Sequence, residues 1–283
     1  MRLANQGGRA VLVTDGDVID VAEASGGRFG PDPQAVYEAW PEFTAWAADG
    51  HAPTGKLDEA ALGPVSPAAR QVFAVGLNYA DHAAESGHPI PEYPMIFTKF
   101  PSSLAGPYGE VALPSGSVDW EVELVVVIGR PASAVRPEDA WQYVAGLTVG
   151  QDLSEREVQR RGQPPQFSLA KSYTGFGPTG PVLTTLDEVG DPAALGLTTT
   201  LNGEVVQDGS TASMIFSVPE LIGYLSAVCT LLPGDLIFTG TPPGVGQSRT
   251  PPRFLAPGDV LETTISGLGT MRQTCVAQAP SER

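Results

Sequence analysis

The stretch VDWEVELVVVIG, residues 118–129, gives the strongest β-strand signal in the chain. Side chains alternate between the two faces of a strand, so Glu121 and Glu123 share one face while Val122 and Leu124 share the other. The aliphatic residues that follow occupy both faces, which predicts a strand buried on both sides at its far end. Two neighbouring carboxylates are therefore expected at the near end, close to a core.

Paired carboxylates at a buried strand end repel each other and are costly when ionised and unpaired. A positive group should then lie between Glu121 and Glu123, either an Arg or Lys side chain or a metal ion. The strand pattern alone leaves a second interpretation open, in which the strand end is exposed and both glutamates are solvated.

A third acidic residue, Asp152, follows the apolar segment of GLTVGQDLSEREVQ and opens a polar segment. The commonest role of such an Asp is a helix N-cap. Arg156 and Gln159 follow Asp152 at helical spacing and can face the same way. Three carboxylates without Cys or His nearby would form an all-oxygen site, which suits Mg²⁺, Mn²⁺ or Ca²⁺ rather than zinc.

The stretch GLNYADHAAESG, residues 76–87, predicts a tight turn followed by a short alanine-rich helix that ends at Gly87. His82 and Glu85 are three residues apart and lie on one helix face, so Glu85 can accept from one imidazole nitrogen while the other faces a cleft. The same spacing also describes an ordinary surface Glu–His pair, which the residues alone favour. The alanines around the pair suit a mobile lid.

Composition limits the class of protein. The chain has 283 residues, 33 Gly, 27 Pro and only 17% charged residues, which favours many short strands and turns over long helices. A net charge of −16 argues against nucleic acid and anionic membranes as partners. The N-terminus shows no signal peptide and no apolar run is long enough to cross a bilayer, so a cytoplasmic location is expected. Cys229 and Cys275 are expected to be buried free thiols, with one disulfide as the alternative.

The order of elements predicts an α+β chain that is mostly β. Two strands around Asp15-Gly16 and a broken amphipathic helix form a small N-terminal α/β domain over residues 1–68. Residues 69–283 form a larger β-rich domain with short helices. One of these helices begins near Ser217, which has capping-box spacing to Glu220.

Two loops add candidate polar groups. Lys99 and Lys171, two of only three lysines, follow apolar segments in FTKFPSS and SLAKSYTGFG, although composition favours chance surface placement. TGTPPGVG, residues 239–246, lacks the Gly-Lys-Ser/Thr ending of a nucleotide-binding P-loop. Its backbone N–H groups, with the hydroxyls of Thr239 and Thr241, could instead bind a carboxylate.

Taken together, these motifs resemble the fumarylacetoacetate hydrolase (FAH) family, including its acylpyruvase, oxaloacetate decarboxylase and 2-hydroxyhepta-2,4-diene-1,7-dioate isomerase-type members. The resemblance runs from about Val72 to the C-terminus. It rests on seven motifs in family order: GLNYADHAAE, FTKFPSS, DWEVELVVVIG, GQDLSEREVQ, SLAKSYTGFGPTGP, LNGEVVQDGSTASMIFSVPELI and LLPGDLIFTGTPPGVG. It implies a FAH-type mixed β-roll or sandwich and a homodimer.

The resemblance also implies roles for individual residues. Glu121, Glu123 and Asp152 are implied as ligands of Mg²⁺ or Mn²⁺, with Ca²⁺ as a further candidate. His82, Glu85 and Lys171 are implied as catalytic. The residues implied to contact a small oxo-acid substrate are Arg156, Gln159, Thr241 and Asn78.

The implied activity is divalent-metal-dependent hydrolysis of a C–C bond in acylpyruvate or fumarylacetoacetate-like 1,3-diketo acids. The alternatives are an oxaloacetate-type decarboxylase, a 2-oxo-enoic diacid isomerase or hydratase, and a metal-binding homologue without turnover. A plain acid-binding β-module would need no metal. In VQRRGQPPQFSLAK, Arg160 and Arg161 predict a cationic rim that selects dianionic substrates.

Overall fold

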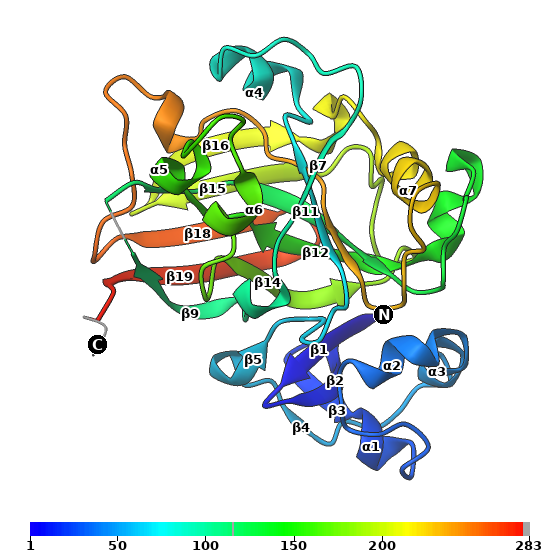
Figure 1. Cartoon of the computed structure of the whole chain (residues 1–283). Coiled ribbons are helices and arrows are strands. Elements are labelled where there is room, and N and C mark those ends of the chain that lie inside the picture. The colour runs from blue at the N-terminus through cyan, green and yellow to red at the C-terminus, as the bar shows by residue number, and fades with distance from the viewer. Residues whose placement is uncertain (115, 280–283) are drawn as a thin grey trace.

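The computed structural model describes residues 1–114 and 116–279, and within them two extended β-sheets form most of the molecule (Figure 1). The large sheet has the order β4 (Gly55–Lys56), β3 (Asp17–Asp20), β2 (Arg9–Thr14), β1 (Arg2–Gln6), β14 (Gly177–Thr184), β12 (Val144–Gln151), β11 (Val122–Ile128), β17 (Leu236–Phe238), β6 (Val72–Gly76) and β7 (Met95–Thr98). At its sides, β5 (Leu62–Gly63) pairs with β1, and β8 (Leu104–Ala105) pairs with β14.

The second sheet has the order β16 (Glu204–Ser210), β15 (Gly196–Leu201), β18 (Val260–Ile265), β19 (Gly269–Ala277) and β9 (Tyr108–Leu113). A two-stranded ladder joins β10 (Val118–Asp119) to β13 (Ser154–Glu155). The helices are short: α1 (Val21–Ala24), α2 (Ala35–Glu38), α3 (Trp40–Ala47), α4 (Ala80–Glu85), α5 (Arg156–Gln159), α6 (Phe167–Ala170) and α7 (Val218–Ser226). Single 3₁₀ turns are η1 (Glu59–Ala61), η2 (Pro101–Ser103), η4 (Thr211–Ser213) and η5 (Gly246–Ser248), and a longer one is η3 (Pro137–Tyr143). The predicted mostly β fold is confirmed.

Strand β11 lies inside the large sheet, between β12 and β17, and every residue in it is buried. Its even-numbered residues, such as Val122 and Leu124, belong to one apolar core, while Val125 and Val127 belong to another on the opposite face. The predicted alternation is therefore present, and it carries Glu121 and Glu123 on the face that leads to Val125. Their position is fixed by the packing of both cores.

The N-terminal strands continue the large sheet. Strand β1 pairs antiparallel with β14, with Leu3 opposite Leu183. The predicted hairpin is present, and its two turn residues, Asp15 and Gly16, have φ of 49° and 83°, as a type I′ turn requires. The segment lies at the end of the molecule opposite helix α4 (Figure 1). A domain boundary near residue 68 stays a prediction.

Two smaller predictions concern local structure. Helix α7 begins with the predicted capping box, in which the backbone N–H of Ser217 donates to Glu220 at 2.7 Å. Cys229 and Cys275 are both free thiols, but only Cys275 is buried, because Cys229 lies half-buried near the end of α7. In the described part of the chain, no helix is long and apolar enough to cross a membrane.

Candidate active site

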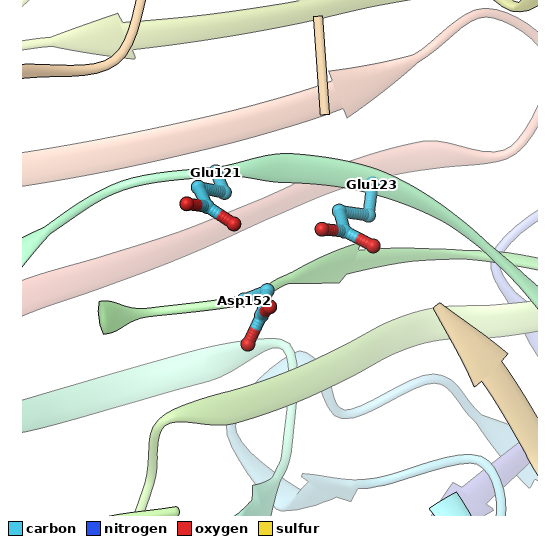
Figure 2. Close-up of side chains that lie close together, drawn as sticks. All are labelled: Glu121, Glu123 and Asp152. Atoms are coloured by element: carbon cyan, nitrogen blue, oxygen red, sulfur yellow. The ribbon is translucent and has the colours of Figure 1, made fainter. Parts of the chain in front are cut away.

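Three buried carboxylates meet at the start of strand β11 and the end of strand β12. Val122 pairs with Gln151 in the antiparallel ladder, which sets Glu121 beside Asp152, and the backbone N–H of Asp152 donates to the carbonyl of Glu121 at 2.9 Å. One carboxylate oxygen from each of Glu121, Glu123 and Asp152 lies within 4.8 Å of the others. Figure 2 shows the two glutamates descending from one strand toward Asp152 on its neighbour.

Buried cations surround this triad. Lys171 Nζ donates to Glu121 at 2.6 Å and to Asp152 at 2.5 Å. Arg156 contacts the other oxygen of Glu121 at 2.8 Å. Lys99 Nζ donates to the second oxygen of Asp152 at 2.6 Å, and also to the backbone carbonyl of Lys171. All three cations are at most 2% exposed.

Burial and the neighbouring charges shift the pKa values of Glu121 and Glu123 in opposite directions. Burial raises the pKa of Glu121, but the positive charges of Lys171 and Arg156 outweigh it and lower this pKa to about 2. Burial raises the pKa of Glu123 well above its ordinary value, and the negative charges of Asp152 and Glu121 raise it further. Glu123 forms no ion pair of its own in residues 1–114 and 116–279. It is the carboxylate that lacks a positive partner.

The donor set fits a hard divalent cation. All three groups offer oxygen, which Mg²⁺ and Mn²⁺ prefer. Counting Asp119 with the triad gives four carboxylates against three cations (Lys99, Arg156 and Lys171), so negative charge is in excess when all are ionised. A divalent cation held by Glu121, Glu123 and Asp152 would offset that excess.

The loop of residues 239–246 binds carboxylates through its backbone, but these carboxylates belong to the protein. The N–H of Gly240 donates to Glu123 at 2.8 Å, that of Gly244 to Glu85 at 3.0 Å, and that of Gly246 to Asp119 at 2.7 Å. Gly240 and Gly244 have φ of 99° and 106°, a region that favours glycine. The loop thus binds Glu123 of the triad and Glu85 on the helix that carries His82.

The predicted His–Glu contact is present on helix α4. His82 Nδ1 lies 2.7 Å from Glu85 Oε1, and Glu85 also accepts from Gly244. With Nδ1–H as the donor, Nε2 is left free of hydrogen bonds among the described residues. Helix α4 is flanked by Leu77 and Gly87, which both have positive φ. Its movement as a lid stays a prediction.

A cavity of about 110 Å³ lies between His82 of the dyad and two of the three carboxylates. His82, Glu121, Glu123 and Lys171 all line it, together with the predicted substrate contacts Arg156, Gln159 and Thr241. The guanidinium of Arg156 already forms ion pairs with Asp119 and Glu121, which leaves it fewer donors for a substrate. Apolar side chains form another part of the wall: Val75, Leu77, Met95, Phe97 and Phe167.

Asn78 does not lie on this cavity wall, and its role as a substrate contact stays a prediction. Its side chain is fully buried, and its amide donates to the carbonyls of Phe216 and Thr239 at 3.0 and 2.7 Å while accepting from the N–H of Phe216. These bonds occupy the amide. Asn78 therefore joins the start of the α4 segment to the loop that holds Glu123.

The sequence patterns did not indicate the roles of three residues that support the site. Lys99 is a buried partner of Asp152 rather than a surface lysine. Asp119 accepts from Arg156 Nε at 2.8 Å, and strand alternation with Glu121 and Glu123 was the available signal. Gln207 donates to Thr241 at 2.8 Å and accepts from the N–H of Val122, and no local pattern indicated it.

Comparison with known proteins identifies the family. The sequence profile described as "Fumarylacetoacetate (FAA) hydrolase C-terminal" matches residues 71–276, so the chain belongs to the fumarylacetoacetate hydrolase family. The oxaloacetate tautomerase FAHD2A, mitochondrial, of Homo sapiens is 48% identical over 203 residues, which cover 71% of this chain and 65% of that protein. The chain thus matches less than two thirds of the length of this curated relative.

Solved structures extend the similarity over nearly the whole chain. A Mycobacterium smegmatis protein, solved under the provisional name HpcE protein, has 55% identity and a TM-score of 0.95, covering 99% of this chain and 100% of its own. Maleylpyruvate hydrolase from Sphingobium sp. SYK-6, in complex with manganese(II) and pyruvate, has 30% identity and a TM-score of 0.79, covering 99% and 100%. That relative holds the kind of ion that the carboxylate triad here fits.

Proposed function

We propose that this protein is a divalent-metal-dependent hydrolase that cleaves a C–C bond in acylpyruvates and related 1,3-diketo acids. One observation carries the proposal: two of the three carboxylates, Glu121 and Glu123, line the same cavity as Lys171 and His82. A site of this kind combines a place for an oxo acid with a general base. The maleylpyruvate hydrolase relative, solved with manganese(II) and pyruvate, supports the same chemistry.

Glu121, Glu123 and Asp152 would hold the metal ion, Mg²⁺ or Mn²⁺. When bound, such an ion supplies Lewis acidity that favours the enolate form of a 2-oxo acid. Lys171 adds a fixed positive charge on the same cavity wall, where negative charge develops on the oxo-acid part of the substrate. Arg156 holds Glu121 in place, and Lys99 holds Asp152 in place, through buried ion pairs.

His82 is the proposed general base. Its Nδ1–H bond to Glu85 fixes the tautomer and leaves Nε2 to take a proton from water. The water oxygen adds to the carbonyl distal to the carboxylate, and the bond from that carbonyl carbon to the methylene carbon breaks. The methylene carbon then takes up a proton, so one water and one acylpyruvate yield a carboxylic acid and pyruvate.

A second activity has its own support. The human relative at 48% identity is an oxaloacetate tautomerase. Tautomerisation needs proton transfer at the carbon next to the carbonyl but no attacking water, and His82 could perform it in the same cavity. Oxaloacetate tautomerisation is therefore the second candidate function.

The two candidates give different products. Protein stripped with chelator is reloaded with Mg²⁺ or Mn²⁺ and given acetylpyruvate and oxaloacetate in parallel, beside His82→Ala. Metal-dependent loss of the diketone absorbance with release of pyruvate supports the hydrolase. Conversion of enol to keto oxaloacetate, with acetylpyruvate intact, would instead show that the protein is a tautomerase. Release of CO₂ from oxaloacetate would identify a decarboxylase instead.

A further inference from the structure

Gln207 is a buried glutamine on strand β16 of the second sheet, and its side chain reaches strand β11 of the large sheet. The register between β15 and β16 shifts beside it, since Thr199 pairs with Gln207 while Thr200 pairs with Val205. A β-bulge of this kind leaves one extra residue, Val206, in the strand and re-aims the side chain next to it. Val206 and Gln207 are accordingly both buried, although they are consecutive.

The side-chain amide of Gln207 has its full set of hydrogen bonds. Its oxygen accepts from the backbone N–H of Val122 at 3.0 Å and from the hydroxyl of Thr199 at 3.0 Å. Its nitrogen donates to Thr241 Oγ1 at 2.8 Å and to the carbonyl of Pro242 at 2.9 Å. A backbone N–H can only donate and a carbonyl can only accept, so Val122 and Pro242 together fix which way the amide faces.

This orientation decides the role of the Thr241 hydroxyl. Its oxygen accepts from Gln207, and its own hydrogen has no acceptor among residues 1–114 and 116–279. Thr241 is buried and lines the active-site cavity. Thr239 differs, because its hydroxyl donates to the backbone carbonyl of Leu124 at 2.9 Å. Of the two threonines expected to bind a carboxylate, Thr241 is the one that keeps a donor for the cavity.

A second chain of bonds leads from Gln207 to the carboxylate triad. Thr199, which donates to Gln207, accepts from Gln151 Nε2 at 3.3 Å. The side-chain oxygen of Gln151 accepts from the backbone N–H of Glu121 at 2.8 Å. These three polar residues of the chain are at most 1% exposed, so water does not compete for their bonds. One buried network therefore holds both the Thr241 hydroxyl and the backbone of a proposed metal ligand.

We propose that Gln207 is a positioning residue that makes Thr241 a hydrogen-bond donor to the carboxylate of a bound 2-oxo acid. Gln207 does not line the cavity, so it acts through Thr241 rather than on the substrate. Without the amide nothing holds the hydroxyl oxygen, and the hydroxyl can turn its hydrogen away from the cavity. The inference rests on the proposed function and assigns the direction of one of its substrate contacts.

The experiment is a double-mutant cycle on pyruvate binding. Calorimetry with pyruvate is run on Mg²⁺-saturated protein for Gln207→Met, Thr241→Val and the double variant. Thr241→Val should weaken binding about tenfold, because a bond to a charged carboxylate is lost, and Gln207→Met should weaken it several-fold. The double variant should bind as Thr241→Val does, since Gln207 acts through that hydroxyl. Thr241→Ser keeps the hydroxyl and should bind pyruvate nearly as wild type does.

Gln273→Met is the matched control for a purely structural role. Gln273 is 2% exposed, lies on β19 of the same sheet and donates to the carbonyl of Pro107 at 2.6 Å. Both glutamine substitutions should lower the Tm, but only Gln207→Met should change the pyruvate affinity. Gln207→Glu serves if Gln207→Met does not fold. Its carboxylate would accept the Thr241 hydroxyl hydrogen, so pyruvate binding should fall at least as far as in Thr241→Val.

Losses that multiply in the double variant would overturn the proposal, because Gln207 would then act independently of Thr241. Unchanged pyruvate binding in Thr241→Val, or in the Gln207 variant that folds, would overturn it too. The binding cycle needs no turnover, so it separates this inference from the proposed hydrolysis. The cycle can succeed while acetylpyruvate stays intact, and it can fail while acetylpyruvate is hydrolysed.

Discussion

Gly244 donates its backbone N–H to the carboxylate of Glu85 at 3.0 Å, across 159 residues of sequence. The contact orients the acceptor for His82 from outside helix α4. The same loop donates to Glu123 through Gly240, so one segment positions both the proposed general base and a proposed metal ligand. A disturbance of this loop should therefore affect chemistry more than it affects folding.

Gly244→Ala tests this contact. Gly244 has φ of 106°, and an added Cβ would lie 2.2 Å from the carbonyl oxygen of Val206, so the loop must shift away. We expect kcat for acetylpyruvate to fall about tenfold or more while Mg²⁺ still binds, as for loss of a group that orients a functional side chain. The control is Gly190→Ala, where the new Cβ meets open space. Equal kinetics in both variants would argue against the contact.

Glu123→Gln should act in opposite directions on the metal-free and metal-loaded protein. Glu123 is buried beside Glu121 and Asp152, so removing its charge relieves repulsion and should raise the Tm of the metal-free protein. The Mg²⁺ affinity should fall about tenfold or more, which shrinks the Tm rise that Mg²⁺ produces. Thermal melts with and without Mg²⁺ measure both, with Glu110→Gln on the exposed side of β9 as the control. A Mg²⁺ response equal to that of wild type would remove Glu123 from the ligand set.

Lys99→Met should destabilise the protein strongly. The substitution leaves Asp152 buried with only Lys171 as its cation, and breaking a buried ion pair costs about 3–5 kcal/mol. Urea unfolding measures the loss, and saturating Mg²⁺ should recover part of it, because the ion supplies positive charge to the same carboxylate. Lys56→Met is the matched control, since Lys56 is 83% exposed and its removal should cost less than about 1 kcal/mol. Similar losses in the two variants would contradict the assigned role of Lys99.

The capping box of helix α7 predicts a pH-dependent stability. The hydrogen bonds from Ser217 hold the pKa of Glu220 below its ordinary value of 4.5. A lowered folded-state pKa contributes stability above pH 4.5 that is lost as the pH falls through the folded pKa. Ser217→Ala should cost about 1 kcal/mol at neutral pH and weaken this acid dependence, whereas Ser133→Ala at an exposed position should not. Parallel urea midpoints from pH 3 to pH 7, about the range of carboxylate titration, are the measurement.

The parts of the site that sequence could predict are those with local periodicity. Strand alternation placed Glu121 and Glu123 on one face, and helical spacing placed His82 beside Glu85. The long-range partners carry no local signal. Asn78 meets Phe216 and Thr239 across 138 and 161 residues, so its amide looked free in the sequence although backbone groups occupy it.

Lys99 illustrates the same limit for charges. Its partner Asp152 lies 53 residues away, and a lysine in a polar loop gives no indication of burial until the fold closes over it. A cavity of about 420 Å³ depends likewise on residues that are far apart in the sequence: Glu85 in α4, Arg160 just after α5, and residues 247–250 in and after η5. Adjacent arginines suggested a cationic rim, but only the packing of these segments distinguishes Arg160 from Arg161.

The most direct test of the central claim separates metal binding from chemistry in His82→Ala. Mg²⁺ binding is measured by calorimetry, and release of pyruvate from acetylpyruvate is followed in the same samples. The account predicts that the variant binds Mg²⁺ as wild type does while the rate falls by about 10²–10⁴, the usual contribution of a general base. An unchanged rate, or equal turnover by wild-type protein after the metal is removed, would contradict it.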